Sequence, residues 1–507
     1  MEVAERPVSR AIAPSAAGGS SGTSYQRHCP EETTLYQTLR EHWRTFVSDL
    51  EEEGAHLPRF VTEEVDAFLR CGILAHGFLR VFCDDCRQAR VLAFSCKRRG
   101  FCPSCFGRRM SERGAHLVDN VLPWVPIRQW VLTVPHGLRF AMAHDPALTR
   151  VVHKIFVRSV SQWLRRRARR QGIAGTLKTG AVTVIQRFDS ALGLNIHFHT
   201  LFFDGLYALD HRGSLQFHPT AAPTNQEVAS VAERIFRKVH RMLEDKGDVH
   251  QEGDSVLQAL STASIQRRVA IGPRRGFPLR RLIGDRPPAA RVLGRRCAEV
   301  EGFNLHANTR VAANERARLE NLCRYVARPP LSDQRLEKGP DGNLTLRLKR
   351  PWSDGTTCVI FSPTELIEKL IPLIPRPRCH LTLYSGVLAP AAGWREFVVP
   401  EPAENKQKRP LTASSEHNDG NPARIEGHRR RWIPWADLLH RVFLVDALDC
   451  PRCHGRMRVV AAVMEAGAVR RILEHLRLPS SAPPLAPARA PPSERCDPDQ
   501  HPLPLDS

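Results

Sequence analysis

The cysteine spacing near the N-terminus constrains this chain of 507 residues more than any other feature. Cys83 and Cys86 form one C-x2-C pair, and Cys102 and Cys105 form a second pair after a spacer of fifteen residues. This spacing is typical of a structural zinc site, in which each pair places two thiolates on one side of a tight turn. It predicts one four-cysteine zinc site that lets a small module fold with little core. Buried cysteines without metal are the alternative, and Cys96, a fifth thiol in the spacer, leaves the ligand set open.

The net charge favours a polyanion as the partner of this chain. Lys and Arg number 74 against 53 Asp and Glu, which gives a formal net charge of +21. Basic residues also gather around the cysteines, where we expect them to bind the phosphates of DNA; a solvated basic face is the alternative. These residues are Lys97, Arg98, Arg99, Arg108, Arg109 and Arg113.

Hydropathy gives no sign of a membrane or secreted protein. The first thirty residues lack the apolar stretch of a signal peptide, and no window has the roughly twenty uninterrupted apolar residues that a membrane span needs. We therefore expect a cytosolic protein. In that reducing compartment the fourteen cysteines are better suited to metal than to disulfides.

Composition and periodicity predict six segments. They are a disordered leader at 1–30, a zinc-binding and DNA-binding domain at 31–115, a larger domain at 120–400, a polar linker at 401–425, a small segment at 426–478 and a disordered Pro-rich tail at 479–507. The small segment contains another knuckle, Cys450-Pro-Arg-Cys453. Distant ligands such as Cys379 or His380 would complete a site there, and a simple turn is the other interpretation.

Apolar periodicity in the larger domain alternates between strand and helix patterns. Strands are expected at 129–134, 181–188, 195–203 and 303–311, and helices at 147–170, 227–243 and 314–326. A hairpin joins two of these strands. The pattern predicts an α+β class: a helical, zinc-ribbon-like module followed by an antiparallel sheet with flanking helices.

Two histidines on one expected strand form the candidate catalytic metal site. Period-two geometry places His197 and His199 on one face and Phe198 on the other. Such a pair can hold a divalent cation at a scissile phosphate, although a purely structural role is the alternative. Gln186 on the preceding strand is our choice for a third ligand over His306, because it could reach across a hairpin; the sequence does not fix the register.

Tyr325, one of only five tyrosines, is the candidate nucleophile. It lies on the flank of an apolar helical stripe formed by Leu319, Leu322, Cys323 and Val326. A phenol in this position can attack a backbone phosphate while Arg324 and Arg328 bind neighbouring phosphates. An ordinary surface tyrosine is the alternative.

Taken together, these motifs resemble a known family over roughly residues 35–400. They read FSCKRRGFCPSCFGRRM, WVLTVPHGLRF, VIQRFDSALGLNIHFHTLFFDGLY, GFNLHANTRV, LCRYVARPPL and CHLTLYSGVLAPAAGWRE. The chain resembles the rolling-circle transposases of the HUH superfamily (histidine, hydrophobic residue, histidine), specifically the insertion-sequence ninety-one family.

The resemblance implies a zinc-binding domain followed by an HUH nuclease domain, with DNA at element ends and targets as the partner. It implies that His197 and His199 bind Mg²⁺ or Mn²⁺. By the same resemblance, Tyr325 attacks single-stranded DNA, leaving a 5′-phosphotyrosine link and a free 3′-hydroxyl. Asn321 and Pro329 stand four positions from Tyr325, so the chain looks like a single-tyrosine form. A bacterial, nucleoid-associated location is implied, and homo-oligomerisation is left open.

Two other functions compete with this interpretation. A replication initiator or relaxase uses the same chemistry, but the leading zinc module and the absence of a G-x-x-x-x-G-K-[ST] phosphate loop favour a transposase. A non-catalytic zinc-dependent DNA-binding protein would explain the charge and the cysteines. It would leave His197, His199 and Tyr325 unexplained.

Overall fold

The computed structural model describes residues 28–209, 213–246, 255–283, 294–400 and 448–489. The linker predicted at 401–425, and nearly all of the leader predicted at 1–30, lie outside these residues. Contacts divide the chain into two compact units. The smaller unit comprises 1–30, 71–95 and 414–482, and the larger unit comprises 31–70, 96–413 and 483–507.

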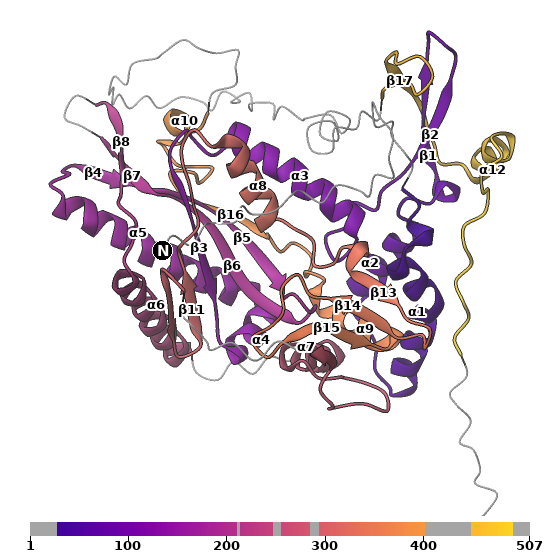
Figure 1. The fold of residues 1–507 in the computed structure, drawn as a ribbon, viewed down its shortest axis with the longest axis horizontal. Helices are drawn as coiled ribbons and strands as arrows, with labels where there is room; N and C mark the ends of the chain where they lie inside the picture. The colour runs from indigo at the N-terminus through magenta and orange to yellow at the C-terminus, as the bar shows by residue number, and fades with distance from the viewer. Residues whose placement is uncertain (1–27, 210–212, 247–254, 284–293, 401–447, 490–507) are drawn as a thin grey trace, which may run out of the picture. The chain divides into compact units, whose positions relative to one another are not determined.

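An antiparallel sheet forms the centre of the larger unit (Figure 1). Its strand order is β10-β11-β3-β6-β5-β16, with β12 also paired to β3. The strands are β3 (Ile127–Thr133), β5 (Gly180–Phe188), β6 (Leu194–Phe203), β10 (Cys297–Val300), β11 (Phe303–His306), β12 (Arg310–Val311) and β16 (Thr382–Gly386). This sheet and its flanking helices confirm the predicted α+β class.

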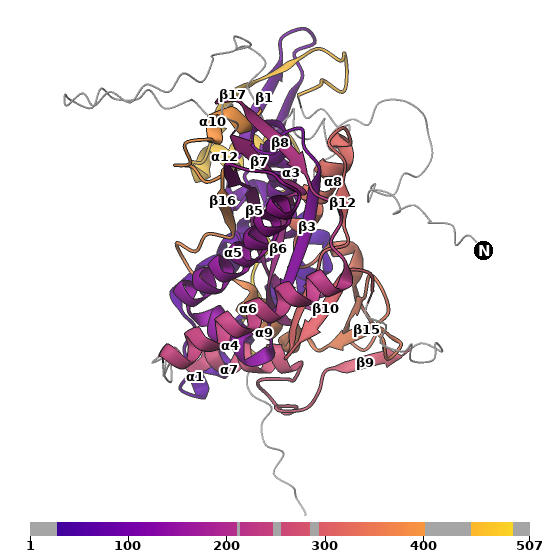
Figure 2. The ribbon, with the colours of Figure 1, turned by 90° about the vertical axis from the view of Figure 1, so that its left-hand side faces the viewer.

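Helices cover both faces of this sheet. The helices of the larger unit are α1 (Thr34–Glu52), α2 (Arg59–Arg70), α3 (Pro103–Asn120), α4 (His136–His144), α5 (Pro146–Arg170), α6 (Asn225–Lys246), α7 (Ser255–Gln266), α8 (Arg316–Val326), α9 (Pro363–Leu370) and α10 (Arg395–Val398). On one face, α5 lies along β5 and β6 (Figure 2), where Phe156 contacts the rings of Phe198 and Phe202. On the other face, α3 and α8 pack together over Leu201 and Phe203.

Side-chain alternation along β6 explains this division. Odd-numbered residues face α3 and α8, and even-numbered residues face α5, as expected for a strand buried on both sides. His197 and His199 therefore lie on the same face as α8. The chain thus places the histidine pair and the helix carrying Tyr325 on one side of the sheet.

Two smaller antiparallel sheets complete the larger unit. One has the order β13-β14-β15-β9 and the other β4-β7-β8. Their strands are β4 (Thr176–Lys178), β7 (Gly205–Leu209), β8 (Leu215–Pro219), β9 (Arg280–Ile283), β13 (Leu336–Lys338), β14 (Leu344–Arg347) and β15 (Thr356–Phe361). They extend the fold away from the central strands and carry none of the predicted site residues.

The sheet of the smaller unit is built from two segments that are far apart in sequence. Its sheet has the order β17-β1-β2, from β1 (Phe78–Cys83), β2 (Ala89–Ala93) and β17 (Met457–Val463), and it also contains α12 (Ala466–His475). All neighbouring strands are antiparallel. Val469 and Leu473 of α12 pack with Phe78 in a small buried cluster.

This arrangement departs from the predicted boundaries of 31–115 and 426–478. The hairpin at 78–93 belongs with the C-terminal segment, because β1 has hydrogen-bonding partners on both edges and β17 supplies one of them. The flanking parts of the predicted zinc domain, α1, α2 and α3, belong to the larger unit. Local composition could not reveal a strand pairing of such long range.

The beginning of the predicted disordered tail also differs from expectation. Residues 479–489 are described without helix or strand, and two of their backbone N–H groups donate to α1. Ala486 N donates to the Arg40 carbonyl at 3.1 Å, and Arg489 N donates to Thr45 Oγ1 at 3.1 Å. The remaining residues, 490–507, lie outside the described structure.

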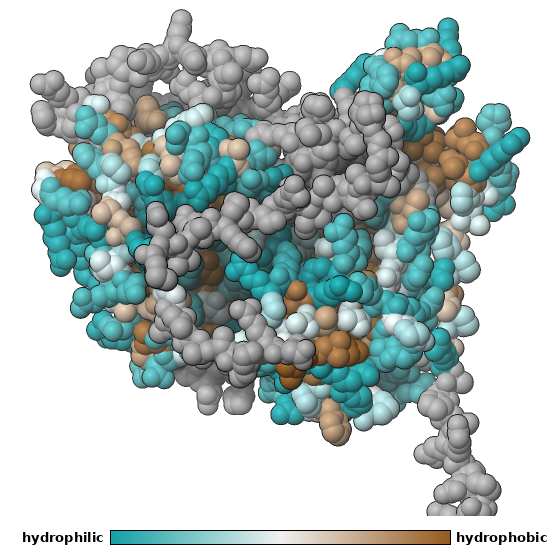
Figure 3. Space-filling model, in the orientation of Figure 1, coloured by the Kyte–Doolittle hydropathy of each residue, from teal (hydrophilic) through white to brown (hydrophobic). Residues whose placement is uncertain are grey.

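Polar side chains dominate the described surface on the face shown in Figure 3, and hydrophobic residues appear there in small patches. Across the described ranges, the helices are either too short or too polar to pass through a lipid bilayer.

Candidate functional site

The two histidines of β6 are buried and point their Nε2 atoms at each other. These atoms lie 3.1 Å apart, and the side chains of His197 and His199 are only 8% and 5% exposed. The Nδ1 atom of His197 lies 2.9 Å from the carbonyl oxygen of Asn195, and that of His199 lies 2.7 Å from Nε2 of Gln129. Each ring is therefore oriented by the contact at its Nδ1 atom, and the Nε2 atoms of the two rings converge on one point.

Burial sets the protonation state of this pair. It lowers the pKa of His197 to about 4 and holds the pKa of His199 well below its usual value, where the neighbouring His197 lowers it further. Both imidazoles are thus neutral near pH 7, which is the form that binds metal. The two Nε2 atoms, 3.1 Å apart, are close enough for one cation to be held by both.

The strand register places the two candidate third ligands at different distances from the histidine pair. Gln186 is the direct cross-strand partner of His197, whereas His306 on β11 is separated from β6 by β3. The amide nitrogen of Gln186 donates to the carbonyl of Val326 at 2.7 Å. Its Oε1 atom is buried and has no hydrogen-bond partner within the described residues. The position of Gln186 therefore fits a third ligand better than that of His306.

Tyr325 lies beside this pair. Its ring centroid is 6.1 Å from that of His199, with the two rings nearly perpendicular. Leu319, Cys323 and Val326, three residues of the predicted stripe, form the buried face of α8. Tyr325 lies on the flank of this helix and is 48% exposed. Among the described tyrosines it is the one with an exposed side chain.

Close packing of α8 against α3 fixes the position of Tyr325. A Cβ atom on Gly114 of α3 would lie 2.6 Å from Cγ of Arg324, so the helices approach where only glycine fits. At the start of α8, Arg316 donates to the carbonyls of Pro123 at 3.0 Å and Leu122 at 2.9 Å. These contacts join the helix that carries Tyr325 to the segment that directly follows α3.

Several of the predicted basic residues converge near the same place. Arg99, Arg113 and Arg328 line a pocket together with Gln186. The guanidinium of Arg328 also lies 4.5 Å from the Tyr325 ring centroid, and burial lowers the pKa of Arg113. A fourth arginine of the lining, Arg187, was not predicted, and burial lowers its pKa to about 10.

The other predicted DNA-binding residues lie outside this pocket lining. Arg98 faces Glu63 at 3.7 Å, and Arg108 pairs with Glu112 at 2.9 Å. Arg109 donates to the carbonyl of Lys97, whose side chain is exposed, and Arg324 donates to Asn321. These cations sit on the surface and are partly engaged by the protein's own acceptors.

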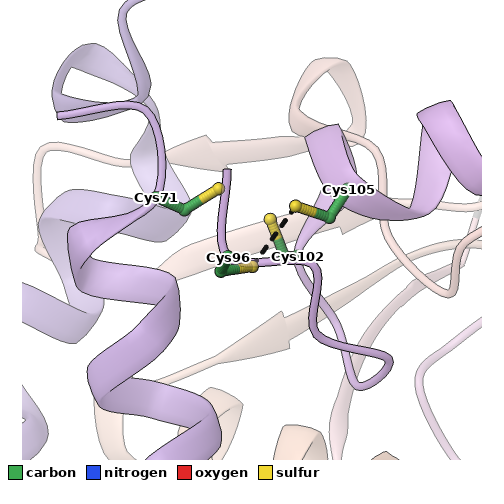
Figure 4. Close-up of side chains that lie close together, drawn as sticks. All are labelled: Cys71, Cys96, Cys102 and Cys105. Atoms are coloured by element: carbon green, nitrogen blue, oxygen red, sulfur yellow. Dashed lines mark hydrogen bonds between the residues drawn. The ribbon is translucent and has the colours of Figure 1, made fainter. Parts of the chain in front are cut away.

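Eight cysteines form two separate groups. One consists of Cys71, Cys96, Cys102 and Cys105, and the other of Cys83, Cys86, Cys450 and Cys453. Within each group the four sulfur atoms lie within 4.8 Å of one another. Figure 4 shows the first group, in which the side chains converge and Sγ of Cys96 lies 3.3 Å from that of Cys105. Each group has the donor set of a four-thiolate zinc site.

The predicted zinc ligand set needs correction. Cys83 and Cys86 do not lie with Cys102 and Cys105, because the β1–β2 hairpin carries the first pair to the knuckle that precedes β17. Cys96 is a member of the group that contains Cys102 and Cys105. The partners suggested for the C-terminal knuckle, Cys379 and His380, belong to neither group.

Sequence reasoning missed four contributors to these sites. Gln129 has no motif of its own, and its contact with His199 follows only from the pairing of β3 with β6. The sequence could have indicated Arg187 only through its position directly after Gln186. Cys71 lies outside the C-x2-C pattern, and Arg316 is visible only as one more basic residue on a helix.

Comparison with protein families gives the class of this protein. A family model described as "Putative transposase" matches residues 180–394, which contain the histidine pair, Gln186 and Tyr325. The IS91 model described as "Transposase zinc-binding domain" matches residues 38–134, and the two ranges together cover more than half of the chain. Fold and matches thus define a transposase with a zinc-binding domain, an enzyme class that acts on DNA.

Both matches are consistent with an IS91-family transposase. Comparisons with curated proteins and with solved structures gave no match.

Proposed function

We propose that this transposase is a metal-dependent tyrosine endonuclease and strand transferase that nicks and rejoins single-stranded DNA at insertion-sequence ends. Transposition of the rolling-circle type would follow from this reaction. One observation carries the proposal: the exposed Tyr325 ring lies 6.1 Å from His199, which belongs to a converging, neutral histidine pair.

The catalytic metal site would use His197, His199 and Gln186. The two neutral imidazoles and the unpartnered amide oxygen provide three donors for one divalent cation, and the amide oxygen is the kind of donor that Mg²⁺ and Mn²⁺ prefer. When bound, the cation would polarise the scissile phosphate and help to neutralise the charge that develops on it. Gln129 acts as a positioning residue, since it holds the ring of His199 through Nδ1.

Tyr325 would perform the covalent step. Its phenolic oxygen forms a bond to phosphorus while the bond from phosphorus to the 3′-oxygen breaks, and the phenolic proton passes to solvent at this exposed position. The products are a 5′-phosphotyrosine and a free 3′-hydroxyl. One phosphodiester is exchanged for another, so attack by a DNA hydroxyl rejoins the strand without ATP. Asn321 and Pro329, four positions away, offer no second phenol, which favours a single-tyrosine cycle.

Two sets of basic residues would bind DNA, one lining the pocket and one on the surface. Arg99, Arg113 and Arg328 beside Gln186 are placed to hold phosphates close to the scissile bond. Lys97, Arg98, Arg108, Arg109 and Arg324 would contact the backbone at the surface, where they add affinity but little sequence information.

A structural zinc ion would be bound by Cys71, Cys96, Cys102 and Cys105. This group lies within the range matched by the zinc-binding family model, and Cys102 and Cys105 begin α3. Because α3 packs against α8, the zinc would stabilise the base on which the nucleophile's helix rests.

Covalent capture of DNA tests the proposal. The full chain is incubated with single-stranded oligonucleotides carrying the element's ends, labelled at either the 5′ or the 3′ end, with Mg²⁺, Mn²⁺ or EDTA. We expect a denaturation-resistant adduct that retains the 3′ label and releases the 5′-labelled fragment, and that requires metal.

Two variants make the experiment specific. Tyr325→Phe removes the proposed nucleophile and should abolish the adduct. Tyr207→Phe removes a phenol that is 8% exposed, and whose pKa burial raises to about 12, so it should leave the adduct unchanged. Adduct formation by Tyr325→Phe would refute the assignment. DNA binding without an adduct under any of these conditions would favour a non-catalytic DNA-binding protein.

A further inference from the structure

We propose that Cys83, Cys86, Cys450 and Cys453 bind a second zinc ion, which fastens the hairpin of β1 and β2 to the C-terminal segment. Cys450 and Cys453 lie far outside the range matched by the zinc-binding family model, so that match does not account for this site. The four residues all belong to the smaller unit.

The sulfur positions fit one tetrahedral ion. Sγ of Cys83 lies 3.5 Å from that of Cys453, and Sγ of Cys86 lies 3.4 Å from that of Cys450. Zinc–sulfur bonds of about 2.3 Å in a tetrahedron separate sulfur atoms by roughly 3.8 Å. A disulfide needs about 2.05 Å and joins sulfurs only in twos, whereas here all four approach one another.

The two knuckles also share one pattern of backbone hydrogen bonds. The first cysteine of each donates its N–H to the carbonyl five residues later: Cys83 to Gln88 at 2.9 Å, and Cys450 to Gly455 at 3.0 Å. The shared pattern indicates two copies of one ligand-bearing turn.

Backbone conformation supports the same conclusion. The residue after the second cysteine has a left-handed conformation in each knuckle, with φ of 58° at Arg87 and 57° at His454. Neither residue is glycine, so each turn adopts this less favourable conformation at some energetic cost. Strand pairing then resumes symmetrically, with Phe82 opposite Ala89 and Asp449 opposite Arg456.

The surrounding core is too small to make the cysteines ordinary packing residues. Cys83 and Cys450 are fully buried, and they share a cluster with only Val81, Leu92 and Met457 as further buried members. Cys453, by contrast, is exposed, whereas a free cysteine with a purely structural role is usually buried. A metal would supply folding free energy that so few apolar side chains cannot.

Zinc content of the full-length chain tests this inference. Elemental analysis should give two zinc ions per wild-type chain and one in the double variant Cys450→Ser/Cys453→Ser. Cys102→Ser/Cys105→Ser should likewise lose one ion, from the other group. Cys297→Ser/Cys358→Ser alters two cysteines outside both groups and should retain two.

A second set of measurements covers the case in which the serine variant fails to fold. Cys450→His keeps a zinc-binding side chain and should retain two ions. In a titration of the zinc-free wild-type chain with Co²⁺, the absorption of tetrahedral thiolate coordination should stop increasing at two equivalents. One zinc ion in the wild-type chain, or two in a folded Cys450→Ser/Cys453→Ser chain, would overturn the inference. Neither result would bear on the tyrosine chemistry.

Discussion

Asp204→Asn removes a negative charge from a buried ion pair at the end of β6. The carboxylate of Asp204 accepts two hydrogen bonds from Arg128, at 2.7 Å and 2.9 Å, and the two side chains are 3% and 2% exposed. Arg310 adds a third contact at 2.9 Å but is 46% exposed. The substitution therefore leaves the Arg128 guanidinium charged, buried and without its counter-ion.

The expected cost follows from that burial. Removing one partner of a buried pair costs about 3–5 kcal/mol, and an asparagine that still accepts one hydrogen bond favours the lower end. A loss of about 3 kcal/mol corresponds to roughly a hundredfold increase in the population of opened states. Arg310 should contribute little to this change, because its charge stays hydrated.

Hydrogen exchange followed by mass spectrometry measures this effect locally. Peptides covering β3 and β6 should exchange roughly a hundredfold faster in Asp204→Asn, provided that the strands open reversibly. Asp354→Asn is the matched control, because Asp354 pairs with Arg281 at 2.6 Å but both side chains are more than 40% exposed. That variant should exchange like wild type in β15. Equal behaviour of the two variants would show that burial does not set the strength of the Asp204 pair.

Three further predictions concern the surroundings of the site. Burial lowers the pKa of His153 to about 4, so its neutral state contributes stability that is complete above pH 6.5 and is lost as the pH falls toward 4. His153→Phe should remove about 2.5 kcal/mol of that pH dependence, measured by denaturant unfolding at pH 7 and 4.5; parallel curves for both chains would contradict this. Gln129→Leu should weaken Mn²⁺ binding about 10–100-fold in calorimetry, and unchanged affinity would remove its positioning role. Gly114→Ala should displace Arg324 and slow adduct formation about 10–100-fold, whereas Gly107→Ala, with open space at its Cβ, should not; equal rates would separate this helix contact from catalysis.

Local patterns in the sequence predicted the elements of the site well. Strand periodicity placed 195–203 within one residue of β6 and put both histidines on one face. The apolar stripe of the helix at 314–326 placed Tyr325 on its flank, and the structure has it exposed there. These features depend on neighbours within a few positions, which the sequence displays directly.

Long-range pairing set the limit of prediction. The register that puts Gln186 opposite His197 depends on how two strands align, and their alternation is compatible with several alignments. Two consecutive C-x2-C pairs look like one site in a linear sequence, yet Cys86 contacts Cys450, which is 364 positions away. Among the ion pairs, Arg108 with Glu112 has a readable helical spacing, whereas Arg98 with Glu63 does not.

The pairing of β1 with β17 also bears on how the protein is made. Cys83 emerges from the ribosome 370 residues before Cys453, so at about 5–20 residues per second β1 waits roughly 20–70 s for its second neighbour. During this time one edge of β1 stays unpaired, and an open edge can pair with other chains. The smaller unit can be completed only when most of the nuclease unit has already been synthesised. Pairing of β17 with β1 can therefore occur only after the catalytic part of the chain has been translated in full.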